Sequence, residues 1–174
     1  MPYPEHLVAP MRQELTRLGV EELRTAADVQ AAFARPGSTL LVVNSVCGCA
    51  AANARPAISL ARQGRVQPDH YVTVFAGQDL DATATARHLL DGIPPSSPSM
   101  FLLVDGEPVF AVERRHIEGR GAGAIATDLV RAFEAHIGAE TNAAETGDGA
   151  TARPDVPEAR PEDRGLPSTF RSIL

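Results

Sequence analysis

The 174-residue sequence has no tryptophan, only two cysteines and no long run of apolar residues. Its longer apolar stretches, such as TLLVV at 39–43, are far shorter than the roughly 20 residues that a membrane-spanning helix needs. The first residues, MPYPEHLVAP, also lack the basic start and the apolar stretch of a secretory signal. We therefore expect no membrane segment, no secretory signal and a cytoplasmic protein.

Basic residues are not in excess either, because the formal net charge at pH 7 is −6. A nucleic-acid-binding surface needs clustered lysine and arginine, so no nucleic-acid partner is expected. The five histidines include no closely spaced pair that would complete a zinc site with the cysteines. In the cytosol a pair of cysteines is more often redox-active or metal-binding than structural.

The composition changes near Gly138, which divides the chain into two parts. Residues 1–138 alternate between helical and strand-like patterns, as expected for one folded domain. Residues 139–174 are rich in Gly, Pro, Glu, Thr and Arg, with almost no apolar residues before the terminal FRSIL. Such a segment cannot bury enough apolar surface to offset its ordering entropy, so we expect a disordered tail.

Amphipathic spacing and end signals predict the helices of the first part. Apolar residues recur every three or four positions in the first helix, which Gly19 ends. Thr25 and Asp28 form a capping box, with Asp in place of Glu, at the start of the second. Pro56 lies inside the third helix and should kink it. The predicted helices cover 10–18, 25–34, the segment from the Cys-Gly-Cys turn to about 63, 81–92 and 121–137.

Short apolar and β-branched runs predict the strands. STLLVVN at 38–44 is typical of a strand covered on both faces, and HYVTVFAG at 70–77 is the second. MFLLVDGEPVFAVER at 100–114 contains two apolar runs around Asp105-Gly106, a pair favoured in hairpin turns. The strands that alternate with helices should be parallel, and the hairpin antiparallel. The sequence thus predicts an α/β fold, with a central four-stranded mixed sheet and helices on both faces.

The two cysteines, Cys47 and Cys49, lie in NSVCGCAAANARPA, where the strand at 38–44 ends and a helix begins. Free N–H groups and the helix dipole stabilise a thiolate there. Residues two apart on a regular helix point away from each other, so a bond between the sulfurs requires Cys47 to precede the helix. Gly48 would then absorb the unusual backbone angles. We predict a redox pair in which Cys47 attacks a disulfide and Cys49 resolves the product.

A further signal precedes the hairpin, in PPSSPSMFLL at 94–103. Pro98 follows Ser97 directly before a strand, where a proline is a candidate for a cis peptide bond. A cysteine turn between strand and helix, followed later by this proline and a β-hairpin, is the plan of the thioredoxin fold.

From about Met11 to His136 the chain resembles the bacilliredoxin family, thioredoxin-like proteins with a Cys-Gly-Cys active site. The segments that carry the resemblance are PMRQELTRLGVEELRT, VNSVCGCAAANARPA, PPSSPS, DGEPVF and HIEGR. The resemblance implies a thioredoxin-like fold and the removal of bacillithiol from protein mixed disulfides in the bacterial cytosol. The implied partners are bacillithiolated or disulfide-bonded proteins and a small thiol, with no cofactor other than the exchanged bacillithiol.

Carried onto this chain, the resemblance makes Cys47 the residue that receives bacillithiol and Cys49 the residue that releases it. Pro98 would lie beside the cysteines and help to hold the substrate backbone. The absence of tryptophan departs from ordinary thioredoxins and favours thiol-specific exchange over simple thioredoxin activity. The predicted substrate-binding residues are Pro98, Ser97, Gly48, Asn44 and His116.

Each of the other polar residues near these motifs has two possible roles. His116 and Arg120, in HIEGR after the last strand, would approach the site or lie in a surface loop. Asn44 and Ser45 would hydrogen-bond the cysteine turn, as backbone support rather than catalysis. Arg55 would add positive potential near the thiolate or remain solvated.

Three alternatives stay open at the level of sequence. The first is a general protein disulfide reductase or isomerase. The second is a module that clamps zinc or Cu(I) between the two thiols, which nothing but the thiols supports, so no metal ligands are predicted. The third is a binding protein whose tail is the interaction element.

Overall fold

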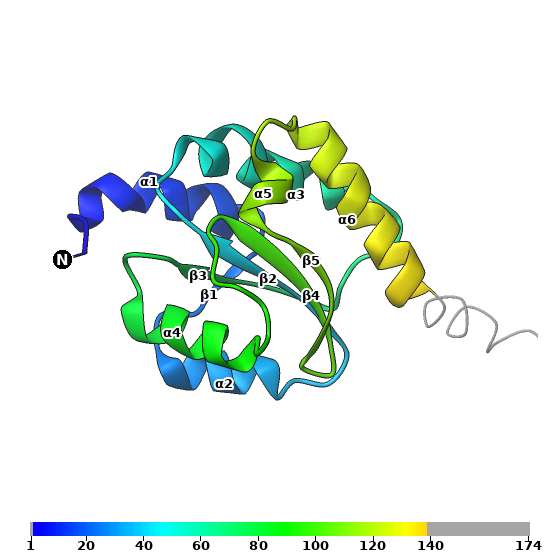
Figure 1. The fold of residues 1–174 in the computed structure, drawn as a ribbon, viewed down its shortest axis with the longest axis horizontal. Helices are drawn as coiled ribbons and strands as arrows, with labels where there is room; N and C mark the ends of the chain where they lie inside the picture. Colours follow the sequence, from blue (N-terminus) through cyan, green and yellow to red (C-terminus); the bar gives the residue numbers. More distant parts are fainter. Residues whose placement is uncertain (1, 139–174) are drawn as a thin grey trace, which may run out of the picture.

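A five-stranded mixed sheet forms the centre of residues 2–138, the part of the chain that the computed structural model describes (Figure 1). Its strands are β1 (Glu21–Glu22), β2 (Ser38–Asn44), β3 (His70–Phe75), β4 (Ser99–Val104) and β5 (Glu107–Val112). They lie in the order β1-β3-β2-β4-β5. β3 pairs parallel with β1 and β2, whereas β4 pairs antiparallel with β2 and β5.

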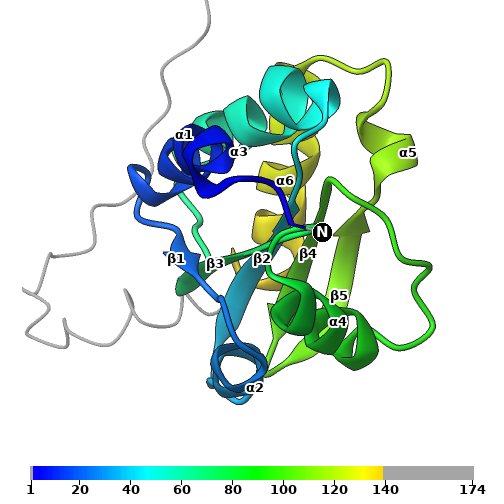
Figure 2. The same ribbon diagram turned by 90° about the vertical axis from the view of Figure 1, so that its left-hand side faces the viewer.

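Helices cover both faces of this sheet (Figures 1 and 2). The helical segments are α1 (Glu5–Thr16), α2 (Ala26–Phe33), the π-helical η1 (Ala50–Ala54), α3 (Arg55–Ala61), α4 (Leu80–Leu89), α5 (Arg114–Ile117) and α6 (Ala122–His136). One core cluster contains Leu15 of α1, Ile58 of α3 and Leu129 of α6. The other contains Val29 of α2 and Ala86 of α4. The predicted α/β fold of the thioredoxin type is confirmed.

The predicted number of strands is one too low, because β1 adds a fifth strand at the edge of the sheet. Its two residues, Glu21 and Glu22, pair with Val72 and Thr73 of β3. Two adjacent glutamates show no alternation of apolar and polar residues, so only the long-range pairing defines this strand.

β2 is buried along its whole length, as its uniform apolar pattern predicts. Leu40 and Val42 belong to one core cluster, and Leu41 and Val43 to the other. Because alternate side chains of a strand point to opposite faces, both layers of the protein fix β2. The strand is therefore a rigid support for the residues that follow its last residue, Asn44.

Two turn and cap predictions are confirmed. At the start of α2 the Asp28 N–H donates to Thr25 Oγ1 (3.2 Å), and the Thr25 N–H donates to Asp28 Oδ2 (2.9 Å). Asp105 and Gly106 join β4 to β5 with φ angles of 49° and 84°. Both values lie in the left-handed region that tight hairpin turns require.

The first helix differs from its prediction at its N-terminus. α1 begins at Glu5 and contains Pro10, which is exposed. Its buried face includes Arg12, whose guanidinium pairs with Asp79 (2.8 Å) and Glu22 (2.9 Å). These hydrogen bonds, that to Asp79 first, raise the pKa of Arg12. A buried ion-pair cluster thus joins α1 to β1 and to the residue before α4.

The third helix is also built differently from the prediction. The π-helical η1 follows Cys49, and α3 begins at Arg55 with Pro56 in its first turn. A proline is well accommodated there, because first-turn N–H groups have no partner within the helix. The irregularity expected at Pro56 takes the form of a wider, π-helical turn directly before it.

The domain boundary was predicted at residue 138, and α6 ends at His136. The tail predicted at 139–174 lies outside the described residues. From residue 2 to residue 138, no helix has the length and apolar character needed to cross a membrane.

Candidate active site

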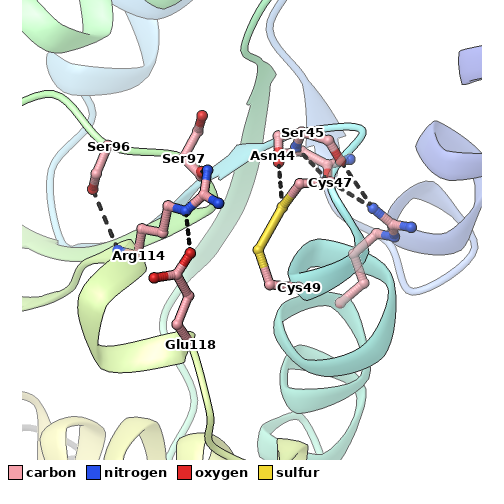
Figure 3. The surroundings of a disulfide bond; sticks show 9 residues. Asn44, Ser45, Cys47, Cys49, Ser96, Ser97, Arg114 and Glu118 are labelled. Carbon is pink, nitrogen blue, oxygen red and sulfur yellow. Dashed lines mark hydrogen bonds and ion pairs between the residues drawn. A yellow bond between two sulfur atoms is a disulfide. The ribbon is translucent and has the colours of Figure 1, made fainter.

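The Cys-Gly-Cys segment lies at the end of β2, where the chain turns into a helix (Figure 3). Helical structure begins at Gly48, and the Cys47 carbonyl accepts hydrogen bonds from Ala50 N–H (3.0 Å) and Ala51 N–H (3.3 Å). Cys47 therefore precedes the helix, as the prediction for bonded sulfurs requires. Cys47 and Cys49 form a disulfide with their Cα atoms 5.5 Å apart, within the ordinary range.

The prediction for the backbone of Gly48 is wrong. Gly48 is not among the glycines with positive φ, and it is exposed. A Cβ built on it would meet no atom within 4 Å. Because Cys47 stands outside the helix, the two sulfurs meet while Gly48 keeps ordinary helical geometry. The glycine leaves open space beside the disulfide instead of relieving a clash.

The two cysteines differ in their surroundings. Cys47 is one of the residues that line a groove of about 290 Å³, whereas Cys49 packs against the core cluster beneath α3 and α6. Other residues that line the groove are Tyr3, Ser45, Arg87, Ser97 and Arg114.

The residues just before Cys47 form a hydrogen-bonded support for the turn. The Ser45 hydroxyl donates to Cys47 Sγ at 3.4 Å. Asn44 Oδ1 accepts from Ser45 N–H (2.9 Å) and from Arg55 Nη1 (3.2 Å). Asn44 is buried and does not line the groove, so it orients the turn and does not face a substrate.

Arg55 is not solvated, and its guanidinium hydrogen-bonds the cysteine turn. It is 4% exposed, and its Nη1 donates to the Ser45 carbonyl at 3.2 Å. Its Nε pairs with Glu14 of α1 at 2.6 Å. This ion pair joins α1, α3 and the end of β2 behind the cysteine turn.

The Ser97–Pro98 peptide is cis, as predicted. β4 begins at Ser99, which pairs with Val43 of β2, so this peptide lies beside the end of β2. Pro98 is buried, while Ser97 lines the groove together with Cys47. The proline loop and the cysteine turn thus line the same groove, although they are far apart in sequence.

Two arginines of the groove were missed by the sequence analysis. Arg87 belongs to α4, and Arg114 opens α5 on the side of the groove opposite the disulfide (Figure 3). Arg114 Nε pairs with Glu118 at 2.6 Å, and its Nη1 lies 3.5 Å from the Ser97 carbonyl. α5 has only four residues, too few to give a helical pattern in the sequence.

His116 lies outside the cysteine groove. Its Nδ1 accepts a hydrogen bond from the Glu113 N–H at 3.1 Å. It lines a second cavity, of about 470 Å³, together with residues of β5 and α6. Arg120 lines the same cavity and pairs with Asp128 at 2.7 Å. The structure therefore does not bring His116 and Arg120 together with Cys47.

Within the described part of the chain, no three residues of the types His, Cys, Asp or Glu gather in a way that could hold a metal ion. The cysteines are joined to each other in this structure. The chemistry that the site displays is the making and breaking of a disulfide.

The chain is similar to known proteins. Residues 3–137 match the family described as disulphide isomerase. A bacilliredoxin of Salinibacter ruber (strain DSM 13855 / M31) is 58% identical over 176 residues, which cover 99% of each protein. A bacilliredoxin of Symbiobacterium thermophilum is 51% identical over 138 residues, covering 76% of this chain and 98% of that protein.

Among solved structures, the reduced thioredoxin pre-protein of Schistosoma mansoni is 18% identical to this chain, with a TM-score of 0.45. The match covers 66% of this chain and 97% of that one. At this level of likeness the fold assignment rests on the strand order and on the sequence relatives. By those relatives, the chain belongs to the bacilliredoxin family of thiol–disulfide oxidoreductases.

Proposed function

We propose that this protein removes bacillithiol, or a related small thiol, from mixed disulfides of proteins in the bacterial cytosol. The observation that carries the proposal is the unequal placement of the two cysteines, with Cys47 in the groove and Cys49 against the core. The reaction needs these two residues and the exchanged thiol, without a bound cofactor.

In the first step the Cys47 thiolate attacks the small-thiol sulfur of the mixed disulfide. A new bond joins Cys47 to the small thiol, the old disulfide breaks, and the protein substrate leaves as a thiolate that takes up a proton. The Ser45 hydroxyl donates to Cys47 Sγ, and hydrogen bonding to a thiolate favours the charged, attacking form.

In the second step the Cys49 thiolate attacks Cys47 Sγ and expels the small thiol. The product is the Cys47–Cys49 disulfide that the structure contains. Two electrons have passed from the cysteine pair to the mixed disulfide, which becomes two thiols. The cycle is completed by a reductant, either a dithiol or two molecules of a small thiol, which restores the cysteine pair.

The test uses a bacillithiol-modified carrier protein and the Cys49→Ala variant, analysed by mass spectrometry. We expect bacillithiol on Cys47 and an unmodified carrier, because the variant can attack but cannot resolve. The Cys47→Ala variant is the matched control and should leave the carrier modified. Modification of Cys49 in that control, without modification of Cys47 in the first variant, would reverse the assigned roles, and no transfer in either variant would refute the proposal.

A broader disulfide reductase or isomerase is the second candidate, because the matching family is described as disulphide isomerase. The same groove would then take a peptide segment with an ordinary protein disulfide. Reduction of a disulfide-bonded carrier by the reduced protein, at a rate equal to that of bacillithiol removal, would favour this second function.

A further inference from the structure

The groove beside Cys47 carries a positive charge that contrasts with the rest of the chain. Arg87 and Arg114 both line it, and none of the described residues that line it is a carboxylate. The whole chain has a net charge of −6, so this pair is not part of a generally basic surface. Two cations at the rim of a groove attract an anionic group into it.

Arg87 lacks the partners that a partly buried guanidinium usually has. Its Nε is buried with no hydrogen-bond partner in residues 2–138. None of the ion pairs formed among these residues includes Arg87. No side-chain hydrogen bond among residues 2–138 involves its terminal nitrogens either, so these nitrogens are available to an oxygen acceptor in the groove.

Arg114 is only partly neutralised. Its Nε pairs with Glu118, and both side chains are about half exposed, at 48% and 53%. Figure 3 shows this pair on the wall that faces the disulfide. The remaining guanidinium nitrogens have room to take a second carboxylate, since a guanidinium carries five N–H donors in a planar fork.

We propose that Arg87 and Arg114 form an anion-binding subsite, which holds carboxylate groups of the small thiol while its sulfur is bonded to Cys47. This inference rests on the proposed function and names a chemical feature of its substrate. A groove of about 290 Å³ is at the small end of ligand sites, which suits a small acidic thiol. A carboxylate could also come from an acidic side chain next to the modified cysteine of the protein substrate.

The test measures transfer to Cys47 from a single-cysteine carrier protein, in the Cys49→Ala background. The carrier bears either mercaptosuccinate, which has two carboxylates, or uncharged 2-mercaptoethanol. The quantity compared is the ratio of the two transfer rates, and each variant is compared with its parent. Because each ratio is divided by that of the parent, the difference in intrinsic reactivity between the two thiols cancels.

We expect the ratio to fall about tenfold when Arg87→Gln and Arg114→Gln are combined, because each lost ion pair is worth a factor of about two to five. Glu118→Gln should raise the ratio about twofold, because it removes the competing carboxylate. Arg115→Gln is the control: it removes one arginine, as each of the two groove substitutions does, but Arg115 pairs with Glu113 and does not line the groove. Its ratio should equal that of the parent.

The outcomes separate the inference from the proposed function. Transfer that proceeds with an unchanged ratio in the arginine variants would overturn the subsite and leave the exchange activity standing. No transfer from either thiol would refute the proposed function itself. A third carrier completes the experiment. It has acidic residues beside its cysteine, and that cysteine is modified with uncharged 2-mercaptoethanol. Arginine dependence confined to that carrier would assign the subsite to the protein substrate and overturn the assignment to the small thiol.

Discussion

The arginines on the two sides of the cysteine groove differ in how fully their charges are paired within the protein. On the cysteine wall, the buried Arg55 is paired with Glu14 and hydrogen-bonded to the turn. On the opposite wall, Arg114 is only partly compensated by Glu118, and Arg87, which also lines the groove, has a buried nitrogen without a partner in the described chain. Charges paired inside the protein hold a structure, whereas charges left unpaired beside a groove are available to a ligand.

The largest effect should come from breaking the pair on the cysteine wall. Glu14→Ala leaves the buried guanidinium of Arg55 without its carboxylate. Because the Glu14 side chain is itself 47% exposed and Arg55 keeps its hydrogen bonds to the cysteine turn, the loss should be about 1.5 kcal/mol of unfolding free energy. Arg114→Gln breaks a half-exposed pair and should cost less than about 1 kcal/mol. Urea unfolding of both disulfide-bonded variants measures the difference, and equal losses would contradict the contrast between the walls.

A smaller effect is expected from the hydroxyl that contacts the sulfur. Ser45→Ala removes the hydrogen bond to Cys47 Sγ, so alkylation of reduced Cys47 should shift to higher pH. The rate at pH 7 should fall only about threefold, because a more basic thiolate is also a better nucleophile. Ser97→Ala removes a second hydroxyl of the groove without touching this hydrogen bond. An unshifted alkylation profile in Ser45→Ala would remove Ser45 from the mechanism.

The smallest effect concerns the glycine between the cysteines. Gly48→Ala should raise the unfolding free energy by about 0.5–1 kcal/mol, since its angles are helical and a Cβ would meet nothing within 4 Å. Gly106→Ala is the contrasting control, because Gly106 has a φ of 84° and its Cβ would collide with the Phe33 carbonyl. Thermal unfolding of both variants checks this, and a destabilised Gly48→Ala protein would show that the turn requires glycine.

The parts of the fold that the sequence predicted are those determined by neighbouring residues. The Thr25 cap and the turn at Asp105-Gly106 depend on a few adjacent residues, and both are present. The burial of β2 on both faces follows from its central apolar run, residues 40–43. The position of Cys47 before the helix followed from the geometry of residues two apart.

The parts that were missed depend on contacts between distant segments. β1 forms because Glu21 and Glu22 pair with β3, and no local sequence pattern predicts this strand. The burial of Arg55 depends on Glu14, which lies 41 positions earlier in the sequence. Arg114 reaches the groove through a four-residue helix whose place is set by the end of β5. His116, only two residues further, lines a different cavity.

The central claim is that its position in the groove makes Cys47, and not the core-packed Cys49, the residue that accepts the small thiol. The most direct measurement is the rate of adduct formation in Cys49→Ala and Cys47→Ala side by side, by peptide-mapping mass spectrometry with the same modified carrier. The account predicts rapid, complete modification of Cys47 in the first variant and little or none of Cys49 in the second. Equal rates at the two cysteines would contradict it.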